Sequence, residues 1–273
     1  MNVKNSDLYR ALRNSLHIFQ KEITVSSSVF SCSENIRVPS HRQSSQITTH
    51  PCRSPHACAK CTPQIHAQRR KEMERLISDR LNSSRPVFRL DLTLGFSETD
   101  GLHERYQVLL TVWKTFATTK EFKEVRRTHG MEYVRVLEET YSSKGWFPHF
   151  HLLVTFEREE NAWDRIDHLI QGWVRAARKL GANAKTGSQG IDRLQKAESA
   201  SATSWYLSKH GRFDLKFKSK TWQAGDRPVR PLLLLMAAAA QGDLELVAEW
   251  NIFERASQGK RRYAWSRGLG HYF

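Results

Sequence analysis

Two histidines flank one phenylalanine at the head of an apolar run in the stretch GWFPHFHLLVTF, residues 145–156. On a strand, side chains two residues apart point to the same face, so His149 and His151 would converge. Imidazole nitrogens bind divalent transition metals, and two of them alone leave coordination positions open. The same pair could instead be two polar residues on a half-buried strand. The residues around the pair must distinguish these interpretations.

A carboxylate completes the pair if the preceding residues form the partner strand of a hairpin. The segment EYVRVLEETY is followed by a turn around SSKG and then by the histidine strand. A turn centred on residues 143–144 places Glu138 opposite His149, and directly opposed side chains share a face. Two imidazoles and one carboxylate suit Mg²⁺ or Mn²⁺ acting on a phosphate. A register shift of one residue would turn Glu138 away and present Glu139 instead.

A tyrosine and two basic residues share one face of an expected helix in ATSWYLSKH, residues 202–210. Tyr206, Lys209 and His210 stand at helical positions i, i+3 and i+4. A phenol has a pKa of about 10 and is a poor nucleophile until a cation or a base assists it. Lys209 could hold a phosphate oxygen or stabilise the phenolate. The alternative is a tyrosine in the core beside a lysine in solvent.

A second group of metal-binding residue types lies near the N-terminus. The chain has four cysteines: Cys32, Cys52, Cys58 and Cys61. Cys58 and Cys61 have the spacing of a chelating pair, and four thiolates satisfy a structural zinc ion. In a cytosolic protein cysteines are metal ligands or free thiols more often than disulfides. We therefore predict a Zn²⁺ site, for which His56 and His66 are competing ligands.

The charge of the chain indicates a polyanionic partner. Formal net charge is +15 and the isoelectric point is about 9.9. Nucleic acid fits this excess better than a membrane surface, although the charge could also serve solubility alone. Residues 1–19 have no apolar core followed by a small-residue cleavage site, as a secretory signal would, and the longest apolar run, 232–240, is too short to cross a bilayer. We expect a soluble cytoplasmic protein without a membrane partner.

Periodicity predicts the elements that must position these residues. We expect helices at residues 1–23, 62–81, 100–127, 163–180, 196–210 and 243–256, and a further helix that begins at residue 231. We expect strands at 88–96 and 190–194, in addition to the hairpin described above. Residues 24–53 lack periodicity and are expected to be flexible or organised by metal. This order predicts an α+β sandwich in which helices cover one face of a mainly antiparallel sheet. The phosphate-loop signature GxxxxGK[ST] is absent from the sequence.

Three segments, in this order, resemble motifs of the replication initiators of rolling-circle plasmids, within the HUH (His-hydrophobic-His) endonuclease superfamily. They are RLDLTLG at 89–95, RVLEETYSSKGWFPHFHLLV at 135–154 and WYLSK at 205–209. The cysteine cluster running into HAQRRKEM and the C-terminal RRYAWSRGL are also similar to segments of these proteins. The resemblance covers most of residues 50–270 and implies an HUH endonuclease-like fold. We expect an N-terminal Cys-rich zinc segment (1–62), a catalytic domain (63–215) and a basic helical C-terminal extension (216–273).

The resemblance implies a single-strand DNA nickase acting at a replication origin. A divalent ion held by His149, His151 and Glu138 would polarise the scissile phosphate. Tyr206 would become joined to the 5′-phosphate and leave a 3′-hydroxyl, with Lys209 as countercharge. A host helicase would unwind the DNA and a host DNA polymerase would extend the 3′-end. This implies a cytoplasmic bacterial protein encoded by a plasmid or phage.

Further residues are expected to contact DNA. They are Asp91, Thr93, Lys216, Lys218, Lys220, Arg261 and Arg262, with Arg227, Arg230, Lys260 and Arg267 nearby in sequence. Asp91 and Thr93 lie on the strand face opposite the apolar one and could line the same site as the histidines. Each phosphate contact made by a basic residue steepens the salt dependence of binding. Trp205, Trp222 and Trp265 could stack on unpaired bases or pack in the core. The basic runs could alternatively be solvated faces.

One position departs from the family pattern. Some of these initiators have a glutamate one helical turn before the tyrosine, which activates water for the closing step, whereas Ala202 stands here. The route of termination therefore stays open, as does the oligomeric state, with a homo-oligomer among the options. Two other interpretations are a transposase or relaxase of the same superfamily and a zinc-stabilised DNA-binding protein without nuclease activity.

Overall fold

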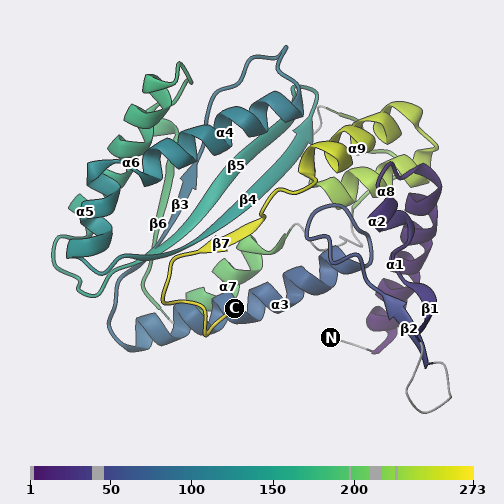
Figure 1. The fold of residues 1–273 in the computed structure, drawn as a ribbon, viewed down its shortest axis with the longest axis horizontal. Helices are drawn as coiled ribbons and strands as arrows, with labels where there is room; N and C mark the ends of the chain where they lie inside the picture. Colours follow the sequence, from purple (N-terminus) through teal and green to yellow (C-terminus); the bar gives the residue numbers. More distant parts are fainter. Residues whose placement is uncertain (1–2, 39–45, 197, 210–216, 225–226) are drawn as a thin grey trace. The chain divides into compact units, whose positions relative to one another are not determined.

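A five-stranded antiparallel sheet forms the centre of the larger part of the protein in the computed structural model (Figure 1). The structure describes residues 3–38, 46–196, 198–209, 217–224 and 227–273. The strands are β3 (Val87–Leu92), β4 (Glu132–Ser142), β5 (Gly145–Thr155), β6 (Gly190–Leu194) and β7 (Tyr263–Trp265). Their order across the sheet is β6-β3-β5-β4-β7. The predicted α+β class and antiparallel sheet are therefore confirmed.

The register of the central hairpin is the one that the sequence predicted. Glu138 on β4 pairs with His149 on β5, and Val136 pairs with His151. Gly145, directly after the two-residue turn, has a φ of +81°, which suits glycine because it has no Cβ. On the other side of β5, Asp91 of β3 pairs with His151. Three strands thus bring their polar residues to one face of the sheet.

Three helices cover the opposite face, on which Phe88 and Phe150 are buried. They are α4 (Leu102–Ala117), α5 (Lys120–Thr128) and α6 (Ala162–Lys179), and Figure 1 shows them along one side of the sheet. The single helix expected over 100–127 is two helices. The hydroxyl of Thr119 accepts the backbone N–H of Phe122, and this N-cap starts α5 after a break.

The face that carries the histidines is covered as well, so the expectation of helices on one face was wrong. Helix α3 (Cys61–Asn82) and helix α7 (Glu198–Leu207) supply the cover. They contribute to one buried cluster that contains Met73, Leu76, Ile77, Val87, Val134, Val136, Leu153, Leu207 and Tyr263. The strands also carry apolar residues on the histidine face, and their burial requires a second helical layer.

Contacts divide the chain into two units, residues 1–67 with 210–259 and residues 68–209 with 260–273. The C-terminal residues group with the sheet because β7 pairs with β4 through Val134–Trp265, Arg135–Ala264 and Val136–Tyr263. The sequence did not predict β7. It placed 216–273 in one extension, whereas 210–259 groups with the N-terminal segment.

The smaller unit contains α1 (Val3–Ile23), α2 (Ser27–Phe30), β1 (Glu34–Val38), β2 (Gln46–His50), α8 (Pro231–Gln241) and α9 (Leu244–Ser257). Strands β1 and β2 form an antiparallel pair that the sequence analysis missed. Helix α8 begins at Pro231 and is followed by Gly242 in the left-handed conformation, while Asp243 caps α9. Among the described residues, no helix is both long and apolar enough to span a bilayer.

Candidate functional site

Glu138, His149 and His151 converge on the polar face of the central hairpin. One ligand atom from each lies within 4.8 Å of the other two. The side chains of Glu138 and His151 are buried, and the His149 side chain is 12% exposed. His151 Nε2 contacts Glu138 Oε2, and His149 Nε2 lies 4.0 Å from Glu138 Oε1. This group could hold a metal ion, and the predicted pairing of Glu138 with His149 is what brings its carboxylate to the histidines.

Asp91 on β3 fixes the orientation of His151. Asp91 Oδ1 lies 2.5 Å from His151 Nδ1. When Nδ1 carries a proton, it donates a hydrogen bond to this carboxylate. Nε2 is then directed at Glu138 and is able to bind a metal. The sequence analysis expected Asp91 to line this site and to contact DNA, and the structure pairs it with a metal-ligand candidate.

The environment prepares His149 to act as a ligand. Burial lowers the pKa of His149 to about 4, although Glu138 acts in the opposite direction. Its imidazole is therefore neutral near pH 7, which is the form that coordinates metals. Burial also works to lower the pKa of His151, but Glu138 and Asp91 outweigh burial and raise this pKa. A bound cation would compensate the two carboxylates in place of that proton.

The ring of Tyr206, on α7, lies beside this group. Its centroid is 5.1 Å from the centroid of the His151 ring. Two cations lie over the phenol ring, with Lys209 Nζ 3.5 Å and the Arg89 guanidinium carbon 4.3 Å from the centroid. Lys209 Nζ also lies 3.1 Å from Glu138 Oε1. The predicted tyrosine therefore lies beside His151, and the predicted lysine contacts Glu138 of the same group.

Burial raises the pKa of Tyr206 to about 12, and the carboxylates of Glu138 and Asp91 add to this effect. Arg89 acts in the opposite direction by stabilising the phenolate. The phenol thus keeps its proton until positive charge is added beside it.

Arg89 is the residue of this site that the sequence analysis missed. Its Nε lies 3.4 Å from Asp91 Oδ1, and its guanidinium also contacts Asp192 on β6. Residues 89 and 91 are two apart on one strand, so the alternation used for the two histidines could have placed Arg89 on the same face.

The other residues expected to bind DNA are placed differently. Thr93 lies beyond β3, where its backbone N–H donates to Gln189 Oε1 at 2.8 Å and its hydroxyl to the Ser188 carbonyl at 3.1 Å. Lys218 and Lys220 are exposed in the smaller unit. His210 and Lys216 lie outside the described residues.

Arg261 is exposed, but its neighbour Arg262 is 1% exposed and forms an ion pair with Glu139. Tyr106 donates a hydrogen bond to the same carboxylate at 2.6 Å. Glu139 follows Glu138 on β4 and therefore points to the opposite face of the sheet. Arg262 thus belongs to a buried structural cluster and does not face solvent, as DNA binding would require.

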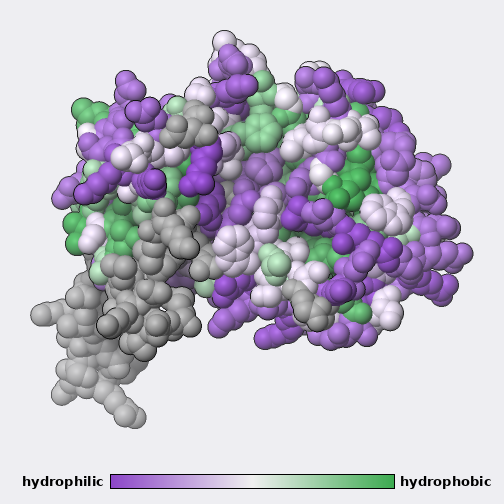
Figure 2. Space-filling view, turned by 180° about the vertical axis from the view of Figure 1, so that it is seen from behind, coloured by the Kyte–Doolittle hydropathy of each residue, from purple (hydrophilic) through white to green (hydrophobic). Residues whose placement is uncertain are grey.

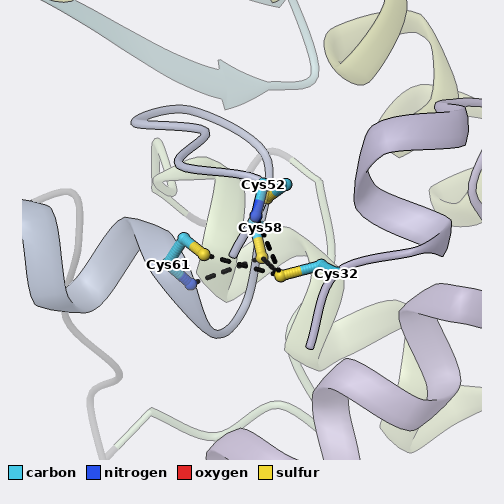
Figure 3. Close-up of side chains that lie close together, drawn as sticks. All are labelled: Cys32, Cys52, Cys58 and Cys61. Atoms are coloured by element: carbon cyan, nitrogen blue, oxygen red, sulfur yellow. Dashed lines mark hydrogen bonds between the residues drawn. The ribbon is translucent and has the colours of Figure 1, made fainter. Parts of the chain in front are cut away.

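The four cysteines meet in the smaller unit, as Figure 3 shows. One sulfur from each of Cys32, Cys52, Cys58 and Cys61 lies within 4.8 Å of the other three. Cys32 Sγ is 3.5 Å from Cys61 Sγ and 3.7 Å from Cys58 Sγ, far beyond the disulfide length of about 2.05 Å. All four are free thiols. Hydrogen bonds from the neighbouring Cys52 and Cys58 thiols lower the pKa of Cys61, which begins α3.

Cysteines alone make up this cluster, and the competing histidine ligands are placed elsewhere. His66 Nε2 lies 3.0 Å from the Pro55 carbonyl. Helix α1 holds the cysteine segment through Gln20, whose amide contacts the Ala57 carbonyl and accepts the Ala59 N–H at 2.9 Å. His17 Nε2 lies 3.3 Å from the Cys32 carbonyl. A four-sulfur group supported in this way could hold zinc.

Comparison of the chain with protein-family models, with curated proteins and with solved structures finds no match.

Proposed function

We propose that this protein is an origin-specific single-strand DNA nicking endonuclease and strand transferase of the HUH type. Its nucleophile is Tyr206, and its product is a 5′-phosphotyrosine link with a free 3′-hydroxyl. The observation that carries the proposal is the placement of Tyr206 beside His151, under two cations and next to an open ligand group. Phosphoryl transfer needs these parts together: a positioned nucleophile, a Lewis acid and countercharge.

The ligand group fits a hard or borderline divalent cation. Two imidazoles and one carboxylate are fewer ligands than Mg²⁺ or Mn²⁺ takes, so positions remain for oxygens of a phosphate. Glu138, His149 and His151 would hold such an ion, which would supply Lewis-acid polarisation of the scissile phosphate. The chain's own contribution is the fixed Nε2 of His151 and the neutral imidazole of His149.

Tyr206 performs the transfer in line with the leaving oxygen. Its hydroxyl loses a proton to water, a bond forms from the phenolate oxygen to phosphorus, and the bond from phosphorus to the 3′-oxygen breaks. The 3′-oxygen takes up a proton and becomes the 3′-hydroxyl. Lys209 and Arg89 stabilise the phenolate and the charge on the phosphate oxygens. Because the two cations already lie over the Tyr206 ring, they need not move into place during the reaction.

The cysteine cluster has a structural role in this proposal. Four thiolates close the coordination sphere of Zn²⁺ and leave no position for a substrate. The ion would tie Cys32, after α2, to the start of α3 and thereby order a segment that has few apolar residues of its own.

The proposed biological setting follows from the chemistry. Single-stranded origin DNA is the substrate, and the net charge of +15 suits it. In this proposal a host helicase unwinds the DNA and a host DNA polymerase extends the 3′-end. A plasmid or phage replicating in the bacterial cytoplasm is the replicon that needs such an enzyme.

The test is covalent capture of DNA. Labelled single-stranded fragments of the replicon that encodes the chain are incubated with the protein and Mn²⁺, then boiled in detergent. We expect a labelled protein band that Tyr206→Phe abolishes and that the control Tyr141→Phe retains. His149→Ala should abolish the band but keep most DNA binding. DNA binding without any adduct from the unmodified protein would instead indicate a binding protein.

A further inference from the structure

An exposed aromatic side chain stands beside the proposed catalytic group. Phe147 is 36% exposed and lies two residues before His149 on β5, hence on the same face. Its ring centroid is 5.5 Å from that of His149, with 33° between the ring planes. Figure 2 shows one face of the molecule, on which hydrophilic residues predominate. A single exposed aromatic side chain is ordinary on a protein surface, so the position of Phe147 beside the ligand group, and not its exposure alone, suggests a role.

A second ring completes a small aromatic pair. Phe96, beyond the end of β3, packs edge-on against Phe147 with centroids 6.0 Å apart and 73° between the planes. Its side chain is partly exposed. The two rings form a pair beside the His149 ring.

Arg105 holds this pair in place from within the protein. Its side chain is buried on α4, and the guanidinium carbon lies 5.6 Å from the centroid of Phe96. The guanidinium donates to the Ser97 carbonyl at 2.7 Å and also to the Trp146 carbonyl. One cation thus anchors the residue after Phe96 and the residue before Phe147. The pair is preorganised, so little side-chain entropy remains to be lost when a ligand binds.

We infer that Phe147, supported by Phe96, is a stacking platform for one unpaired base of the DNA strand whose phosphate lies at Glu138, His149 and His151. The inference rests on the proposed function and identifies a base-binding position within that site. A strand held by one phosphate must place its adjoining bases within a few ångströms of it. Every base has a π-face, so an aromatic ring binds it without sequence preference. Phe147 is therefore a positioning residue that aligns the phosphate with Tyr206.

The position along β5 agrees with this role. Residues two apart on a strand are separated by about 7 Å. The platform is thus near enough to act on a base next to the phosphate and far enough to leave the ligand atoms open. The excess of positive charge suits the phosphate chain on which such a base is carried.

Two probes separate base stacking from phosphate attraction. They are a labelled oligothymidylate and an abasic oligomer of the same length, which has the same charge but no bases. Binding is measured by fluorescence anisotropy with Mn²⁺ present, in the full-length Tyr206→Phe background so that no covalent link forms. We expect Phe147→Ala to weaken oligothymidylate binding roughly 5- to 150-fold, the range for loss of one aromatic–base stack. Abasic binding should not change.

Two variants control for fold and for aromatic character. Phe147→Tyr should keep most of the oligothymidylate affinity. Trp163→Ala should leave it unchanged, because Trp163 is 49% exposed and packs on Phe88, on the opposite face of the sheet. Equal weakening for both probes, or no weakening for either, would overturn the inference.

The proposed function is tested separately by the adduct of the unmodified protein. If the unmodified protein forms an adduct but Phe147→Ala binds oligothymidylate as tightly as its parent, the platform is refuted and the nicking reaction is not. Selective loss of oligothymidylate binding without any adduct would support the platform and refute the nicking reaction.

Discussion

The centroid of the Tyr206 ring lies 5.1 Å from that of His151, although one residue comes from α7 and the other from a central strand. His151 is in turn held by Asp91 on β3 and contacts Glu138 on β4. A helix and three strands thus meet at one imidazole. Preorganisation of this kind lowers a reaction barrier because the groups need not be collected during the reaction.

Lys209 is predicted to act on the transition state. Its ammonium lies 3.5 Å from the Tyr206 ring centroid and 3.1 Å from Glu138 Oε1. Lys209→Met should slow formation of the DNA adduct by about 10²- to 10³-fold, the usual effect of losing one preorganised charge-stabilising group. Mn²⁺ affinity, measured by calorimetry, should not fall. The exposed turn residue Lys144 is the control, and Lys144→Met should react at the parent rate. An unchanged rate in Lys209→Met would remove this residue from the mechanism.

Gly190 is predicted to preserve the Asp91–His151 hydrogen bond. It pairs with Asp91 across β6 and β3, and a Cβ at residue 190 would lie only 2.9 Å from Asp91 Oδ2. Gly190→Ala should therefore displace the carboxylate and weaken Mn²⁺ binding by roughly 10-fold or more, as losses of such supporting contacts do.

Gly187→Ala provides the matched control, because a Cβ at that residue meets nothing within 4 Å. Calorimetric Mn²⁺ titrations of both variants make the comparison. Equal Mn²⁺ affinity in the two variants would show that Asp91 does not support the site.

Arg262 and Arg261 are adjacent, but replacing Arg262 should lower the free energy of unfolding far more than replacing Arg261. Removal of one partner from a buried ion pair leaves an uncompensated charge, so Arg262→Ala should lower the free energy of unfolding by about 3–5 kcal/mol. Arg261 is exposed, and Arg261→Ala should change it by less than about 0.5 kcal/mol. Urea denaturation measures both values. Similar stabilities for the two variants would contradict the assignment of Arg262 to a structural cluster.

The cysteine cluster is predicted to hold one zinc ion per chain. Elemental analysis of the purified protein should find this ion, and Cys58→Ser should lose it because the substitution removes one of the four thiolate ligands. His66→Gln should retain zinc, since His66 lies against the Pro55 carbonyl. Zinc lost in His66→Gln but kept in Cys58→Ser would reverse the ligand assignment.

Local pattern sufficed for the hairpin and its metal-ligand candidates. A strand period of two and a two-residue turn determine that Glu138 opposes His149, without any knowledge of the rest of the chain. The tyrosine face of α7 was predictable in the same way from helical spacing. The contact between Tyr206 and His151 is long-range, and only the resemblance in motif order suggested it.

Other features depend on partners that are distant in sequence. In the sequence, Arg262 cannot be distinguished from the other residues of its basic run. Its role follows from the pairing of β7 with β4, which places it against Glu139. Strand β7 has three residues, too few to show a period. Asp91 was placed on the correct face, but its role depends on the pairing of β3 with β5, which crosses a long connection.

The most direct test of the central claim is to locate the covalent link. The adduct formed with single-stranded replicon DNA and Mn²⁺ is digested with nuclease and protease, and the modified peptide is sequenced by mass spectrometry. We predict a 5′-linked nucleotide on the hydroxyl of Tyr206. A nucleotide found on another residue, such as Tyr141, would contradict the account.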